Sequence, residues 1–148
     1  EKIIRIVTAS KISLKYALAK FYIIDFALKG AKDPVHEFIK RFKKSTSFKV
    51  IVNDIKKIRR LNSKFHPIII KKLGMACSYP GTFNSSIYTI INSRNYKEAI
   101  LKTIKAGGCN CSRANFTGAY FAALKGLNSI PNSWIKKTIP AKKILSQK

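Results

Sequence analysis

The stretch Ala106-Gly107-Gly108-Cys109-Asn110-Cys111-Ser112-Arg113-Ala114 separates two helical patterns in this 148-residue chain. Two glycines follow the apolar pattern that ends near Ala106, and glycine is the usual residue just past a helix C-terminus. A second pattern begins at Ser112 and runs to Lys125 with several small residues, which favour close helix packing. We therefore expect a helix, a tight polar loop and a second helix. The free N–H groups at that helix start favour an anion or a metal-bound oxygen, although an ordinary glycine-capped helix pair has the same pattern.

Helical spacing of apolar residues continues on both sides of this stretch and predicts an all-α fold. Asp33 followed by Pro34 and Asn95 followed by Glu98 are typical helix starts. The segment 67–73 is too short to tell helix from strand. The helices expected are 10–29, 34–44, 49–60, 82–93, 96–106, 112–125 and a short one from Pro131. No repeat or linker divides the chain, so residues 1–148 are interpreted as a single domain.

The first long helix, 10–29, is predicted to be amphipathic and to end at Gly30. Its predicted buried face consists of Leu14, Ala17, Leu18, Phe21, Ile24, Phe26 and Leu28.

The charge balance is strongly basic, with 30 Lys and Arg against 6 Asp and Glu and a net charge of +24. One interpretation is a polyanionic partner such as nucleic acid or an acidic membrane. The other, which we favour, is a genome whose AT-rich codons supply lysine, because the lysines are scattered from Lys2 to Lys148 and few are replaced by arginine. Both interpretations predict non-specific, salt-sensitive binding to polyanions.

Other features of the composition indicate a setting without a membrane. The most apolar stretch, 16–28, contains Lys20 and Asp25, so no span is predicted. Three cysteines are too few for a disulfide scaffold, and a bridge between Cys109 and Cys111 would be strained. A reducing, cytoplasmic location is therefore expected. We see no leader pattern, and the absence of an initial Met suggests an excised piece.

No catalytic residue is predicted from the residues themselves. His36 and His66 have no nucleophilic partner at an informative spacing, the six acids are dispersed, and no glycine-rich phosphate loop is present.

Several pieces in a fixed order do, however, resemble the C-terminal half of the ADP-ribosylglycohydrolases, and within them the jellyfish J-crystallin branch. The pieces are 73–83 (LGMACSYPGTF), 95–99 (NYKEA), 106–114, Gly118-Ala119, Gly126 and 130–134 (IPNSW), with a looser likeness from Ile6-Val7-Thr8 into 17–30. The resemblance covers most of the chain and lacks the family's N-terminal half. It implies an ADP-ribosylglycohydrolase-like helical bundle, of which this chain is the C-terminal part.

The family hydrolyses bonds that link ADP-ribose to protein side chains, with two magnesium or manganese ions between its halves. Some metal ligands come from the loop G-G-D-x-D-T, which falls on residues 107–112. Cys109 and Cys111 stand where that motif has aspartates, and Ser112 stands where it has threonine. In the J-crystallin branch the second aspartate of this motif is already lost. In the present chain, Ala9 also stands where many family members have histidine. Magnesium takes oxygen ligands and thiols are soft, so a working magnesium site on this chain alone is not expected.

The resemblance also implies that part of the family's ligand pocket is retained. The resemblance places Gly74, Ala76 and Cys77 in a segment that lines the adenosine pocket. Arg113 and the helix start at Ser112 are candidates to meet a diphosphate. Gly107 and Gly108 are further ligand-binding candidates. The alternative is that this wall is now only core packing. Ile130 and Trp134 are expected to be core anchors in either case.

Three functional hypotheses follow. The first is a catalytically degenerate, J-crystallin-like protein with a structural or ADP-ribose-related binding role, without a cofactor. The second is a metal-dependent hydrolase acting on ADP-ribosylated protein, whose missing half supplies the remaining magnesium ligands. The third is a basic helical domain that binds nucleic acid. Because half of a fold exposes apolar helix faces, self-association is also expected.

Overall fold

The computed structural model describes residues 9–61, 65 and 67–147, and across these ranges it contains α-helices, one short 3₁₀ helix and no strand. The predicted all-α class is confirmed. Ile6-Val7-Thr8 and His66 lie outside the described residues. The helices are α2 (Lys11–Leu28), α3 (Pro34–Phe42), α4 (Lys49–Arg60), α5 (Pro67–Leu73), α6 (Gly81–Ile91), α7 (Tyr96–Lys105), α8 (Asn110–Lys125), the 3₁₀ helix η1 (Leu127–Ser129), α9 (Asn132–Lys137) and α10 (Ala141–Leu145).

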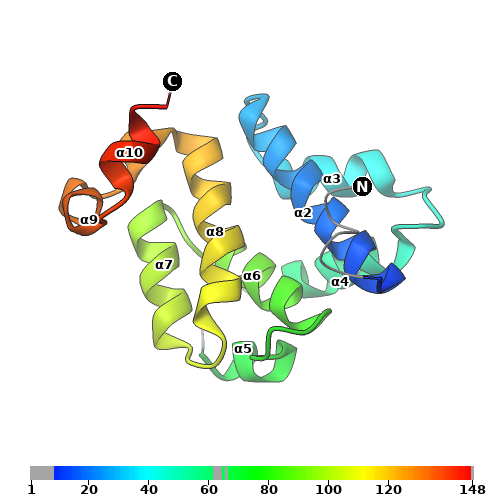
Figure 1. Cartoon of the computed structure of the whole chain (residues 1–148). Coiled ribbons are helices and arrows are strands. Elements are labelled where there is room, and N and C mark those ends of the chain that lie inside the picture. Colours follow the sequence, from blue (N-terminus) through cyan, green and yellow to red (C-terminus); the bar gives the residue numbers. More distant parts are fainter. Residues whose placement is uncertain (1–8, 62–64, 66, 148) are drawn as a thin grey trace.

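Helix α8 lies between the other main elements and contacts α2, α6 and α7 (Figure 1). Its small residues allow this close approach. A Cβ atom on Gly118 would lie 3.4 Å from the Tyr96 hydroxyl and 3.5 Å from the Ile100 side chain of α7. The other side of α8 places Phe116 against Phe83 of α6, with ring centroids 6.0 Å apart. The two loops that enter α6 and α8 are thereby brought to the same end of the molecule (Figure 1).

The predicted helix starts are confirmed at Asp33 and Asn95. The Asp33 carboxylate accepts a hydrogen bond from His36 N at 2.9 Å, and the Asn95 side chain accepts one from Glu98 N at 2.9 Å. Helix α4 has the predicted bounds, and the ambiguous segment 67–73 is helical. Helix α8 begins at Asn110, two residues before the predicted start, so Cys111 lies in its first turn.

The predicted buried face of α2 is wrong for its most exposed members. Phe21 is 63% exposed and Leu28 is 69% exposed. The residues that α2 buries are instead Tyr16, Ala19, Ile23 and Ala27. Helix α2 is apolar on two sides, so apolar spacing alone does not identify which side meets the core.

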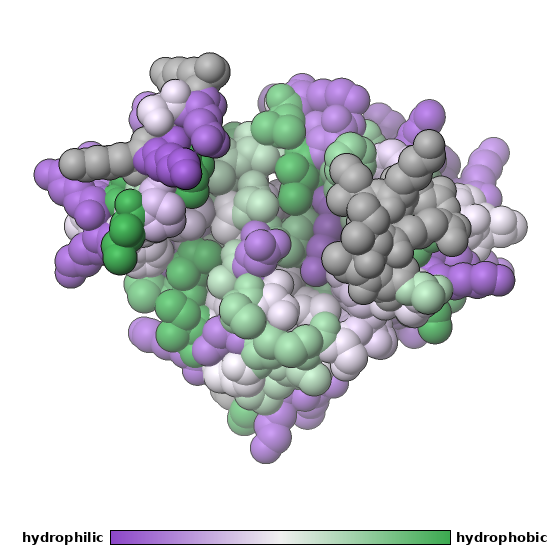
Figure 2. Space-filling model, in the orientation of Figure 1, coloured by the Kyte–Doolittle hydropathy of each residue, from purple (hydrophilic) through white to green (hydrophobic). Residues whose placement is uncertain are grey.

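The surface in Figure 2 is predominantly hydrophilic along its margins, while hydrophobic residues gather between the facing parts of α2 and α8. None of the helices in the described ranges combines the length and apolar character that crossing a bilayer requires.

Candidate functional site

Two loops that are distant in sequence meet at the start of α8. The 74–80 loop joins α5 to α6, and the 106–109 loop joins α7 to α8. The backbone N–H of Cys109 donates to the carbonyl oxygen of Met75 at 2.8 Å. The same carbonyl accepts a hydrogen bond from Arg113 Nη1 at 3.1 Å. One carbonyl group of the first loop is therefore bound by both the second loop and the helix that follows it.

Glycine is required where these loops touch. Gly108 has φ +69°, and a Cβ atom there would lie 2.6 Å from Met75 Cβ and 2.8 Å from its carbonyl oxygen. Gly74 has φ +116°, and a Cβ atom there would lie 2.7 Å from the Cα of Gly81. A side chain at Gly108 would push the two loops apart, and one at Gly74 would push apart the two ends of the 74–80 loop, because neither backbone has room to accept a Cβ atom.

Arg113 holds the second loop from inside. Its side chain is fully buried and donates to Asn110 Oδ1 at 2.9 Å, to the Thr103 carbonyl at 3.4 Å and to the Gly107 carbonyl. Burial lowers the pKa of the guanidinium and the nearby Cys109 thiolate raises it, but arginine remains charged in proteins. The predicted contact of Arg113 with a diphosphate stays a prediction. In the structure, the hydrogen bonds of Arg113 hold the 106–109 loop in place.

The three cysteines are the reactive groups at the junction. Cys77 and Cys111 are exposed and Cys109 is half-buried. The Sγ atom of Cys77 lies 2.7 Å from Cys109 Sγ, which in turn lies 3.8 Å from Cys111 Sγ and 3.1 Å from Ser112 Oγ. The hydrogen bond from Cys77 lowers the pKa of Cys109 to about 7, and the same partnership raises the pKa of Cys77.

The residues at the expected magnesium positions do not fit that ion. Cys109, Cys111 and Ser112 offer two thiols and one hydroxyl, whereas magnesium takes oxygen ligands and is bound through carboxylates. Across the described ranges, no group of three or more His, Cys, Asp or Glu side chains is arranged to hold a metal ion.

The predicted pocket segment lies in the 74–80 loop, where Ala76 and Cys77 are exposed and Gly74 is half-buried. The structure brings Cys77 to Cys109 and brings Gly108 to the neighbouring Met75. It thus joins the predicted adenosine segment and the predicted metal loop into one surface, which we call the loop junction (residues 74–80 and 106–113).

Sequence reasoning missed the residues of α2 that support this junction. Tyr79 of the 74–80 loop stacks on Tyr16, with ring centroids 5.0 Å apart, and Tyr16 donates to Asp54 at 3.4 Å. Burial raises the pKa of Tyr16 to about 12, with a further contribution from Asp54. Lys20 is half-buried with its Nζ atom 5.0 Å from the Tyr79 ring centroid, and burial lowers its pKa to about 8. The aromatic residue Tyr79, just before Pro80, was the local sequence signal for this contact. Its partners, Tyr16 and Lys20, lie about 60 residues earlier in the chain, so the sequence alone did not reveal them.

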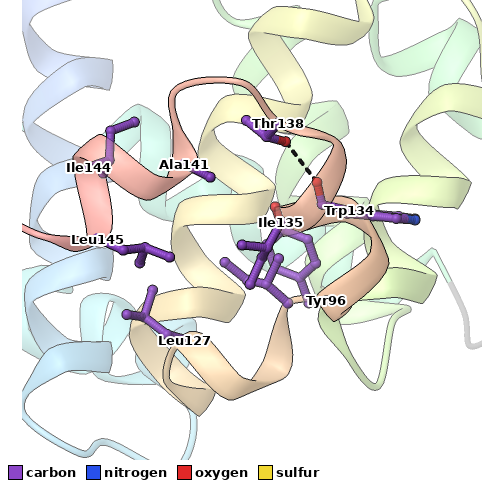
Figure 3. A pocket seen from close by; sticks show the side chains of 9 residues that line it. Tyr96, Leu127, Trp134, Ile135, Thr138, Ala141, Ile144 and Leu145 are labelled. Carbon is purple, nitrogen blue, oxygen red and sulfur yellow. Dashed lines mark hydrogen bonds between the residues drawn. The ribbon is translucent and has the colours of Figure 1, made fainter.

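A separate hollow lies among the C-terminal helices (Figure 3). It has a volume of about 320 Å³ and is lined by Tyr96, Leu127, Ile130, Trp134, Ile135, Thr138, Ala141, Ile144 and Leu145. The expectation that Ile130 and Trp134 are core anchors is wrong, because both are half-buried and line this hollow. The lining carries no charged side chain, and the Thr138 hydroxyl already donates to the Trp134 carbonyl at 2.8 Å. Such a surface lacks the cations that a diphosphate requires.

Comparison with known proteins places these features in a family. The sequence model for ADP-ribosylglycohydrolase matches residues 4–146. Crystallin J1A of Tripedalia cystophora is 38% identical over 69 residues, which are 47% of this chain and 21% of that protein. Crystallin J1B of the same organism is 30% identical over 76 residues, which are 51% of this chain and 24% of that protein. The matched part therefore spans less than a quarter of either curated relative.

The family match extends over nearly the whole chain and includes both loops of the junction. The all-α architecture agrees with the fold that the resemblance implied. This family is generally metal-dependent. The chain belongs to the ADP-ribosylglycohydrolase family.

Proposed function

We propose that this chain is a catalytically degenerate, J-crystallin-like member of its family, forming a single domain that corresponds to one part of the family fold. Its role is structural or ADP-ribose-binding and does not include hydrolysis. The observation that carries the proposal is the donor set at the loop junction, where Cys109 and Cys111 offer thiols. The family resemblance implies two magnesium-binding aspartates at these positions.

Two further observations support a role without turnover. The two matched relatives of Tripedalia cystophora are both named crystallins. The buried Arg113 holds the loop through carbonyl and amide oxygens, none of which belongs to the side chain of residue 109 or 111.

A binding role is supported by the accessible part of the junction. Ala76 and Cys77, for which the resemblance implies a place in the adenosine wall, are exposed. The half-buried Lys20 supplies a cation beside Tyr79. We therefore propose ADP-ribose, free or attached to protein, as the ligand class. We also propose a cytoplasmic location, because the three cysteines are too few for the disulfide scaffold of a small secreted domain.

The test compares the wild-type chain with the double variant Cys109→Asp, Cys111→Asp. Thermal melts are recorded with and without magnesium, and release of ADP-ribose from an ADP-ribosylated protein is assayed in parallel. The wild type is expected to show no shift in Tm with magnesium and no turnover. The double variant is expected to gain a magnesium-dependent rise in Tm, since binding to the folded state alone stabilises it. Cys109→Ser, Cys111→Ser is the matched control, because it removes the thiols without adding carboxylates.

Magnesium-dependent release of ADP-ribose by the wild type would overturn the degenerate assignment and favour a working hydrolase. An unchanged melt of the aspartate variant would instead show that this loop is not a metal edge. For the binding role, ADP-ribose should raise Tm while pyrophosphate should not. If the melt is cooperative and neither ligand changes Tm, the binding role is refuted and the structural role is the one that remains.

A further inference from the structure

We propose that Cys77 and Cys109 form a reversible disulfide that covalently joins the 74–80 loop to the start of α8. The family resemblance implies a ligand wall at Cys77 and a metal loop at Cys109, and neither expectation involves a bond between them. The inference depends on the geometry of the loop junction and requires no bound ligand or metal.

The distance between the two sulfur atoms is the first observation. Cys77 Sγ and Cys109 Sγ lie 2.7 Å apart, and a disulfide bond has a length of about 2.05 Å. Only a small movement of the two side chains therefore separates the dithiol from the bonded pair. The backbones are already fixed on both sides, because Cys109 N donates to the carbonyl of Met75, two residues before Cys77, at 2.8 Å.

The position of the third cysteine favours this pairing over the alternative. Cys111 Sγ is 3.8 Å from Cys109 Sγ, farther than Cys77. A bond between Cys109 and Cys111 would also close a very small ring at the start of α8, which disfavours the geometry that a disulfide needs. Exposure of Cys77 and partial exposure of Cys109 leave the preferred pair accessible to small reagents.

The oxidant is a small-molecule disulfide, for which oxidised glutathione is the probe. The thiolate of one cysteine attacks a glutathione sulfur, forming a mixed disulfide and releasing one glutathione thiolate. The thiolate of the second cysteine then attacks the protein sulfur of that mixed disulfide and releases the other. In sum, two protein thiols lose two protons and two electrons, and one oxidised glutathione becomes two reduced glutathiones.

The bond would enclose α6 and α7, since the paired cysteines are 32 positions apart. Closing a loop of this length restricts the unfolded chain and stabilises the folded state. We expect oxidation to raise Tm by about 5–10 °C. The junction would then be fastened by a covalent bond in addition to the hydrogen bonds at Met75.

The experiment equilibrates the whole chain with oxidised or reduced glutathione, in the presence of EDTA so that no metal competes for thiols. Peptide mapping by mass spectrometry identifies the bond, and thermal melts measure its effect. In the wild type we expect a Cys77–Cys109 bond and the rise in Tm, both reversed by reduced glutathione. Cys77→Ser should lose both, whereas the matched control Cys111→Ser should keep both.

Three results would overturn the proposal: a wild type in which all three thiols remain reactive, a map that shows only glutathione adducts, or a Cys109–Cys111 bond. Variants that fail to fold do not obscure the outcome, because the map of the wild type is decisive by itself. Since none of these measurements uses ADP-ribose or magnesium, failure here is distinguishable from failure of the proposed function.

Discussion

The Nζ atom of Lys20 lies 5.0 Å from the Tyr79 ring centroid and 5.4 Å from that of Phe116, so one ammonium group of α2 lies against both the 74–80 loop and α8. Attraction to the two ring faces favours the charged form. Burial has the larger effect and lowers the pKa of Lys20 to about 8. This contact joins α2 to the loop junction.

Lys20 makes stability depend on pH. The unfolded chain has the ordinary lysine pKa of 10.5, so between pH 8 and 10 it binds more protons than the folded chain. The free energy of unfolding should therefore rise with pH across this window. Above pH 10 the raised pKa of Tyr16 opposes the trend, because the unfolded tyrosine loses its proton first. Urea denaturation at pH 7, 8, 9 and 10 measures the effect.

The variant Lys20→Met should make the free energy of unfolding less dependent on pH between pH 8 and 10. It should raise that free energy most at neutral pH, where the wild type carries a charged, half-buried ammonium group. Lys15→Met is the control, because Lys15 is exposed on the same helix. If the free energy of unfolding of the wild type does not change between pH 8 and 10, the lowered pKa of Lys20 is contradicted.

Contact between the loops makes Gly108 sensitive to substitution. Gly108→Ala should lower the free energy of unfolding by about 3 kcal/mol. Two causes add up: alanine is strained at a left-handed φ, and its Cβ atom overpacks against Met75. Gly30→Ala is the matched control, since Gly30 has φ +79° and no atom within 4 Å of its added Cβ. It should cost only about 1–2 kcal/mol, for the backbone strain. Equal losses in urea denaturation would show that the loops do not touch as described.

Arg113 is expected to contribute strongly to stability through its hydrogen bonds. Arg113→Met should destabilise the chain by about 3 kcal/mol, because several loop oxygens lose a charged donor in a buried place. The exposed Arg60→Met on α4 should change stability by less than about 0.5 kcal/mol. Chemical denaturation compares them, and similar small losses in both would refute the structural role of Arg113.

The second apolar side of α2 predicts self-association. Phe21 and Leu28 are seven residues apart on one face of the helix and are largely exposed. Phe21→Ser should weaken association measured by sedimentation velocity, while Ile139→Ser, at a position that is 97% exposed outside α2, should not. A wild type that sediments as a monomer at all concentrations tested would contradict this prediction.

Local signals predicted the helices well. Asp33 and Asn95 cap the helices that their side chains indicated, and α4 ends where its apolar pattern ends. Packing decided what local patterns could not. The apolar residues of α2 occur on two sides, and only contact with α3 and α8 selects Ala19 and Ile23 for burial.

For the site, the resemblance singled out both loops, and their assignment to a ligand and a metal stays a prediction. The pairing of Cys77 with Cys109 depends on how these two distant loops meet. The same is true of Lys20, which sequence spacing shows as one more lysine in a basic chain. Tertiary contacts of this kind have no local sequence signal, because they depend on the packing of α2 and α6 against α8.

The oxygens that bind Arg113 come from the backbone and from an amide, and no carboxylate is among the bonds described for it. A mutation at position 109 or 111 therefore leaves every one of these acceptors in place. The framework of hydrogen bonds that shapes this loop is thus separate from the side chains at positions 109 and 111, so a substitution there changes the chemistry that the loop offers without removing its scaffold.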